Sequence, residues 1–140
     1  MKNGLAWVSE SPQPESIDAR SVRALVEFRF GDKAKAKEML SHILEDQNED
    51  GSWGWTAGKE GDAWGTGVAL YVLGQLRDVI ENTPETDKRI DAAQKFLAAT
   101  QLEDGSWMVP SKLKKSKKEA RVASFFGTAW SVMGLARTID

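Results

Sequence analysis

One pair of side chains in this sequence combines an acid with an aromatic ring at the start of a predicted helix. Asp62 stands two residues before Trp64, in the stretch 61–66 (GDAWGT). A carboxylic acid there could act as a general acid, and the indole face beside it could stabilise a cation. Asp is also a favoured N-cap residue, and Asp62 directly precedes the helix. We favour the capping role and keep Asp62 as a weak catalytic candidate.

The other polar clusters do not make a catalytic or metal-binding set. The sequence contains no cysteine and one histidine, His42, which we interpret as a surface or boundary residue of a helix. The stretch 46–51 (DQNEDG) begins like a calcium loop, but Ala57 stands at the twelfth position, where such a loop needs a bidentate acid. We therefore predict no metal site and no cofactor.

Charge and hydropathy exclude several classes of partner. Five lysines lie between Lys112 and Lys118, and we favour a solvated loop there over a contact with phosphate or anionic lipid, because the net charge of the chain is −2. The same balance argues against nucleic acid. No apolar run reaches the length of a signal peptide or a transmembrane segment. We expect a soluble, cytoplasmic protein.

Helical periodicity predicts the elements that position these residues. Five helices are expected, over about residues 16–30, 32–47, 63–81, 84–101 and 120–138. The apolar pattern alternates along the chain, since the second and fourth helices carry a single apolar stripe and the third and fifth are apolar almost all round. Helices of the latter kind are buried, which places them in an inner layer with the amphipathic helices outside. The expected fold class is all-α, a partial α/α toroid.

Aromatic residues on the predicted inner helices are candidates to line a hydrophobic cavity. They would offer apolar walls to a hydrocarbon, although buried aromatic side chains commonly serve only as core. The candidates are Trp64, Tyr71, Phe125, Phe126 and Trp130.

A repeated motif closes both predicted outer helices. Segment 47–53 (QNEDGSW) recurs 54 positions later as segment 101–107 (QLEDGSW). The Gln amide can donate to the last helical carbonyls, which lack partners, while its oxygen accepts from the loop. Glycine permits a turn with positive φ, and the Trp can fold back over the helix end. We interpret both copies as structural staples. They are defined by Gln47, Gly51 and Trp53 and by Gln101, Gly105 and Trp107.

This pattern resembles the QW motif (Gln-x3-Gly-x-Trp) of squalene–hopene cyclases and oxidosqualene cyclases, shared more loosely with protein prenyltransferase β-subunits. Residues 93–101 look like the extended form of that motif. Residues 127–135 are similar to the start of the family's inner helices, and residues 65–70 are a weaker counterpart. The resemblance covers about residues 18–138. It implies an (α/α) barrel, of which this chain supplies fewer than half of the helical hairpins.

The catalytic residues that the resemblance implies are missing. Those cyclases protonate their substrate with an Asp-x-Asp-Asp motif, which the sequence lacks, and the prenyltransferase zinc ligands include a cysteine. Asp62 is the nearest acid to an inner-helix start, and the fifth helix has Ser124 and Phe125 near the equivalent point.

We expect residues 1–140 to form one repeat domain of a larger chain or assembly. It would comprise a stub (1–15), a first repeat (16–62), a second repeat (63–119) and a final inner helix (120–138). The expected function is a non-catalytic binding or scaffold module, with part of a terpene-cyclase-like enzyme for an isoprenoid as the alternative. Its partners would be a hydrophobic small molecule or a protein. Because a partial ring exposes inner apolar faces, we also expect either self-association or a compact closed arrangement.

Overall fold

The chain is mostly helical, and its two longest connections between helices span residues 46–62 and 101–116. The computed structural model describes residues 2–80, 83–110 and 117–139, with side chains for residues 4–80, 83–110 and 121–139. A two-stranded antiparallel ladder joins β1 (Trp53–Gly54) to β2 (Gly61–Asp62). The helices are α1 (Lys2–Glu10), α2 (Ile17–Phe30), α3 (Lys33–Glu45), α4 (Ala63–Gln75), α5 (Pro84–Thr100) and α6 (Lys117–Thr138). The all-α, toroid-like fold class is confirmed.

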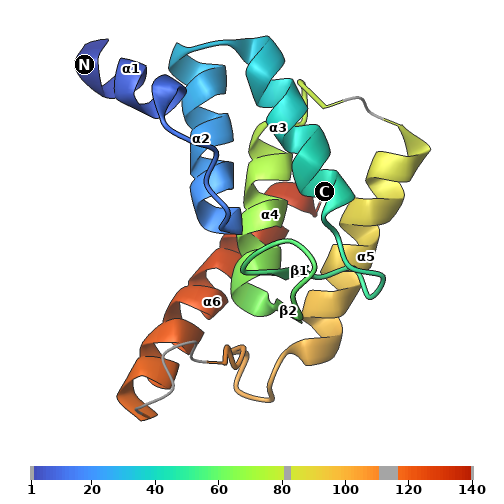
Figure 1. Cartoon of the computed structure of the whole chain (residues 1–140). Helices are drawn as coiled ribbons and strands as arrows, with labels where there is room; N and C mark the ends of the chain where they lie inside the picture. Colours follow the sequence, from blue (N-terminus) through green and yellow to red (C-terminus); the bar gives the residue numbers. More distant parts are fainter. Residues whose placement is uncertain (1, 81–82, 111–116, 140) are drawn as a thin grey trace.

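The helices are arranged around α4, which lies at the centre of the molecule (Figure 1). α4 packs against α2, α5 and α6, and α3 packs on α2. Helices α2, α4 and α6 therefore form one layer, with α3 and α5 outside it. Nine of the thirteen residues of α4 are buried, as expected for a helix that is apolar on most of its circumference. The largest fully buried apolar side chains are Ile17, Leu40, Ile43, Trp53, Leu70, Leu73, Leu76 and Leu97.

Side chains that accept a backbone N–H begin the two outer helices. Asp32 accepts from the Ala34 amide at 2.8 Å where α3 starts, and Thr83 accepts from the Thr86 amide at 3.2 Å where α5 starts. These bonds satisfy donors that have no partner in the first turn of a helix. Ser16 occupies the same position before α2, but its side chain makes no such bond.

Two glycines allow α4 and α6 to approach each other closely. A Cβ on Gly67 would lie 2.4 Å from the Ser131 amide nitrogen, and a Cβ on Gly134 would lie 2.6 Å from the Gly67 carbonyl oxygen. The Ser131 hydroxyl also donates to the Ala63 carbonyl at 2.9 Å. This contact fixes the angle and register of the two inner helices.

Two sequence expectations are wrong. The stretch 1–15 contains helix α1, a sixth helix before the five that were expected. The fifth predicted helix, α6, is not buried like α4, because Phe125 is 69% and Val132 53% exposed. Its apolar circumference predicted burial, but α4 is the main helix packed against α6 and covers only one side of it.

Candidate functional site

The two staples, segments 47–53 and 101–107, have matching backbone geometry. Gly51 and Gly105 adopt φ values of 87° and 83°, which an L-residue with a Cβ rarely takes. Their amides donate to the carbonyls three residues earlier, at 2.9 Å in both copies. In each copy the Gln amide nitrogen donates to the glycine carbonyl, again at 2.9 Å. The repeat in sequence is thus a repeat in structure.

The tryptophan of each staple donates a hydrogen bond to a carbonyl near the end of the preceding outer helix. The Trp53 indole N–H donates to the Ile43 carbonyl at 2.6 Å, and the Trp107 indole N–H donates to the Leu97 carbonyl at 2.8 Å. Both rings are buried. Since the last carbonyls of a helix lack intrahelical donors, these bonds and the buried indole area stabilise the helix end.

The backbone of each staple is also bound to the following inner helix. The Trp53 amide donates to the Thr66 hydroxyl and the Trp107 amide to the Thr128 hydroxyl, both at 3.1 Å. The tryptophan and the threonine lie 13 positions apart in the first copy and 21 positions apart in the second. The lysine run, Lys112–Lys118, falls in the longer connection and lies mostly outside the described residues.

The glutamine side chain acts differently from our expectation. The Gln47 amide nitrogen donates to the Gly51 carbonyl and, at 2.8 Å, to the Arg89 carbonyl on the next outer helix. We expected it to donate to the last carbonyls of its own helix. The buried indole N–H of Trp53 reaches one of those carbonyls, and the Arg89 guanidinium donates to another, that of Leu44, at 2.8 Å. The glutamine is therefore free to join two helices.

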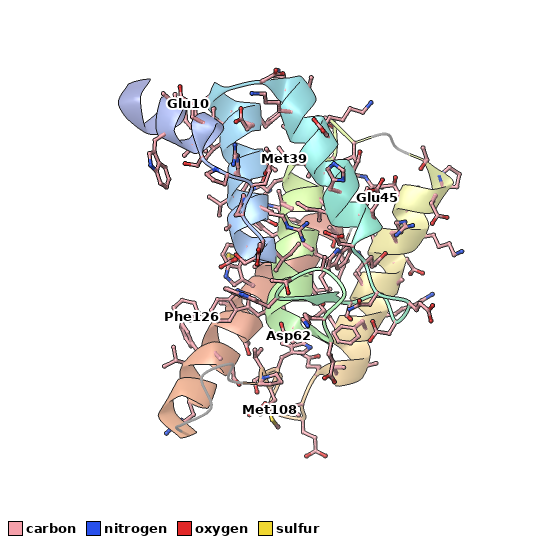
Figure 2. The ribbon with its side chains drawn as sticks, viewed as in Figure 1. Glu10, Met39, Glu45, Asp62, Met108 and Phe126 are labelled. Carbon is pink, nitrogen blue, oxygen red and sulfur yellow. The ribbon has the colours of Figure 1, made fainter. Side chains whose placement is uncertain are left out.

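Asp62 occupies the N-cap of α4. Its carboxylate accepts from the Gly65 amide at 2.8 Å, the bond expected of a capping residue. Figure 2 shows Asp62 where the β-ladder meets α4. Ser124 stands 62 positions after Asp62, as Thr128 does after Thr66, and its hydroxyl accepts from the Val109 amide at 3.0 Å. The acid thus has a polar counterpart in the second repeat that also binds backbone.

An apolar groove lies between the α1–α2 segment and the inner helices. Its volume is about 450 Å³. Trp64 of α4 and Trp130 of α6 form one wall, while Trp7 of α1 and Val22 of α2 contribute to the other. The side chains of Asp18 and Arg23 also border it. Two of the five predicted cavity residues, Trp64 and Trp130, therefore line one groove.

The other predicted cavity residues lie around that groove in a network of ring contacts. Tyr71 contacts Trp130 with ring centroids 5.5 Å apart, and Phe126 contacts Trp64 at 5.7 Å. Phe125 contacts only Phe126 among the described rings, at 5.5 Å. Phe126 lies on the side of α6 away from α5 (Figure 2) and is 44% exposed. Sequence reasoning missed Trp7, because it treated the segment before α2 as a stub, and it did not assign Val22 of α2 to a cavity.

The sequence matches one protein family along nearly its whole length. Residues 8–139 match the squalene-hopene cyclase C-terminal domain family. The chain belongs to this family. The resemblance drawn from the repeated motif is thereby confirmed. A search of curated proteins finds no match to the chain.

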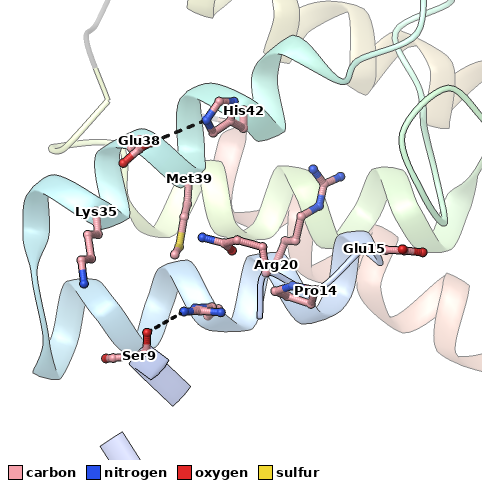
Figure 3. Close-up of a pocket in the computed structure, with 10 residues that line it drawn as sticks. Ser9, Pro14, Glu15, Arg20, Lys35, Glu38, Met39 and His42 are labelled. Carbon is pink, nitrogen blue, oxygen red and sulfur yellow. Dashed lines mark hydrogen bonds and ion pairs between the residues drawn. The ribbon is translucent and has the colours of Figure 1, made fainter. Parts of the chain in front are cut away.

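A second cavity of this cyclase-type domain, which we call the polar pocket, is lined mostly by polar and charged residues and was not predicted. It has a volume of about 590 Å³ and lies between α2, α3 and the segment that precedes α2. Figure 3 shows Arg20 of α2 and, further along the cavity, Lys35 and Glu38 of α3. Arg23, also in its lining, donates to the carbonyls of residues 9, 11 and 12. Arg20 and Arg23 are one helical turn apart, and this spacing could have predicted that both side chains lie on the same face of α2.

The remaining polar candidates do not assemble a metal site. His42 lies on the exposed side of α3, between Glu38 at 3.9 Å and Glu45 at 3.3 Å. Asp46, the first residue of the calcium-like stretch, pairs with Arg20, and Asp50 accepts from the Ser52 amide. Among the described residues, no group of three or more His, Cys, Asp or Glu could hold a metal ion. In the described part of the chain, no helix is long and apolar enough to cross a membrane.

Proposed function

We propose that this cyclase-type domain is a non-catalytic binding module that takes an apolar molecule in the groove of Trp64 and Trp130. The observation that carries the proposal is the groove itself. Its volume of about 450 Å³ falls within the range of small-molecule pockets. Transfer of apolar surface from water into such a groove is favourable by about 25 cal/mol per Å².

The polar groups near the groove support binding rather than chemistry. The Arg23 guanidinium is held by backbone carbonyls, so it forms a fixed wall. Asp62, the weak catalytic candidate, is engaged as the N-cap of α4. The groove lining contains no acid other than Asp18 among the described residues.

Titration of tryptophan fluorescence with farnesol tests the binding function. Farnesol is an apolar isoprenoid alcohol, and its entry should change the emission of Trp64 and Trp130. Val22→Glu places a charge in the groove and should weaken binding roughly tenfold or more, since an unpaired charge is costly in an apolar site. Met108→Glu is the matched control, because Met108 is 71% exposed and does not line the groove. Equal binding by both variants would contradict the proposal.

The family match favours a second candidate function, in which this segment completes the cavity of a cyclase that acts on an isoprenoid. In that case Asp62 would supply the proton and Trp64 would stabilise the cation. Incubation with squalene, followed by analysis of the extracted products, tests this alternative. A cyclised product that is lost in Asp62→Asn would favour the enzyme over the binding module.

A further inference from the structure

The first staple is covered by α5, and this contact shows what such a loop binds. Gln47 donates to the Arg89 carbonyl at 2.8 Å, and the Arg89 guanidinium donates back to the Leu44 carbonyl at 2.8 Å. A Cβ on Gly51 would lie 2.5 Å from the Ala92 carbonyl oxygen, so the turn lies directly against the α5 backbone. The matching helix face thus carries a cation and, three residues later, a small residue.

The second staple has the same shape, but its outer side is exposed. Gln101 donates to the Gly105 carbonyl at 2.9 Å. Within the described ranges, the only non-neighbouring atom within 4 Å of a Cβ on Gly105 is the Gln101 amide nitrogen, at 3.9 Å. Gln101 and Gly105 are both exposed, as are Glu103 and Asp104 between them. The second staple therefore presents to solvent the surface that the first staple uses to bind a helix.

The polar pocket lies on the part of α3 that corresponds to the staple-binding face of α5. A shift of 54 positions superimposes the two outer helices in the register of the repeated motif. The four pocket residues of α3 and their counterparts on α5 are Lys35 and Arg89, Glu38 and Ala92, Met39 and Ala93, and His42 and Phe96. Arg89 and Ala92 are the residues that contact the first staple. The pocket is thus the same face on an outer helix that has no staple against it among the described residues.

We propose that the second staple of one copy of this chain binds in the polar pocket of another copy, so that copies associate head to tail. The staple carries Glu103 and Asp104, and the pocket offers Lys35 in the register of Arg89. The negative charge of the staple and the positive charge of Lys35 are complementary, and this complementarity favours an encounter of the two copies in this orientation. Each copy uses two different surfaces, so the association builds a ring if it closes and a filament if it does not.

Two carboxylates line the pocket and oppose this contact, those of Glu15 and Glu38. Glu38 stands where α5 has Ala92, and it places a carboxylate where the acidic loop approaches. Removing that carboxylate should therefore tighten the association, whereas reversing the charge of Lys35 should weaken it. This opposite response of two neighbouring residues on α3 is specific to the proposed interface.

Sedimentation velocity over a range of concentrations measures the association. We expect concentration-dependent growth beyond the monomer, with a dissociation constant raised about tenfold in Lys35→Glu and lowered in Glu38→Ala. Lys88→Glu on α5 is the matched control, since Lys88 is exposed and belongs to neither surface. A chain that stays monomeric throughout, or association that none of the α3 changes alters, would overturn the proposal.

Disulfide trapping tests which surfaces meet, because the chain has no cysteine of its own. Two single-cysteine variants, Glu103→Cys and Lys35→Cys, are oxidised separately and as a mixture. Head-to-tail contact predicts efficient dimers only in the mixture. Dimers formed equally well by either variant alone would indicate a symmetric contact and would exclude the proposed one.

Discussion

At the residue scale, the glycine turns show how one motif serves two environments. Gly51 and Gly105 have nearly the same positive φ, 87° and 83°. Only Gly51 lies against the backbone of another helix, at Ala92. Glycine is therefore needed in both copies for the positive φ, and in the first copy also because a Cβ would meet the α5 backbone.

We predict that Gly51→Ala destabilises the fold more than Gly105→Ala. The positive φ should cost about 1–2 kcal/mol in either variant. The contact with Ala92 should add about 1–3 kcal/mol for Gly51→Ala alone, because backbone atoms must move. Urea unfolding of both variants measures the difference. Equal free energies of unfolding would contradict the α5 contact.

The acid of the second staple gives a prediction about pH. The Ser106 hydroxyl and amide donate to the Asp104 carboxylate and lower its pKa below the ordinary value. A lowered folded-state pKa means that the carboxylate stabilises the fold above its unfolded-state pKa, and that this stability is lost as the pH falls through the folded-state pKa.

Thermal unfolding of the wild type and Asp104→Ala at a series of acidic pH values measures this effect. The difference in Tm should stay constant from neutral pH down to the unfolded-state pKa of an aspartate and should then shrink. A difference that grows with acidification has the wrong sign and would refute this role of Asp104.

At the scale of elements, helix boundaries follow local capping signals, whereas burial does not follow composition. Asp62 and Thr83 begin their helices through bonds between residues three positions apart. Such short-range signals are visible in the sequence. Helices α4 and α6 have similar apolar patterns, yet α4 is enclosed by three helices and α6 exposes several large apolar side chains. Burial depends on neighbours, which no local pattern encodes.

We predict that Asp62→Ala lowers the free energy of unfolding by about 0.5–2 kcal/mol, the usual cost of losing an N-cap. Asp62→Asn keeps an acceptor oxygen and should cost much less. Asp32→Ala, at the start of α3, is a control for a cap far from the groove. If Asp62→Asn destabilises as much as Asp62→Ala, Asp62 stabilises the fold through its charge rather than through the cap.

At the scale of the whole molecule, the crossing of α4 and α6 sets the shape of the inner layer. Gly67 and Gly134 lie where the two backbones meet, and Ser131 donates across the contact. Trp64 and Trp130 project from these helices into the same groove. The glycines thus bring the two tryptophans together.

We predict that Gly67→Ala destabilises the protein towards the upper end of roughly 1–3 kcal/mol, since the added methyl meets backbone atoms. This loss should exceed the gain of about 1 kcal/mol in helix propensity. Gly4→Ala is the matched control, because a Cβ on Gly4 in α1 meets no atom within 4 Å. Urea unfolding should show a loss for Gly67→Ala only. A stable Gly67→Ala variant would show that the helices do not cross as described.

The sequence alone determined the repeat, the outer helices, the Asp62 cap and the family, because each of these depends on residues a few positions apart or on a short motif. It also singled out Trp64 and Trp130, two of the three aromatic residues that line the groove. Tertiary structure decided which staple is covered, since the bond from Gln47 to Arg89 spans 42 positions. It also decided that Trp7 joins Trp64 and Trp130 at one groove, and that Arg20 and Lys35 share one pocket. These groupings arise from the packing of distant helices, and local periodicity carries no record of which helices will be neighbours.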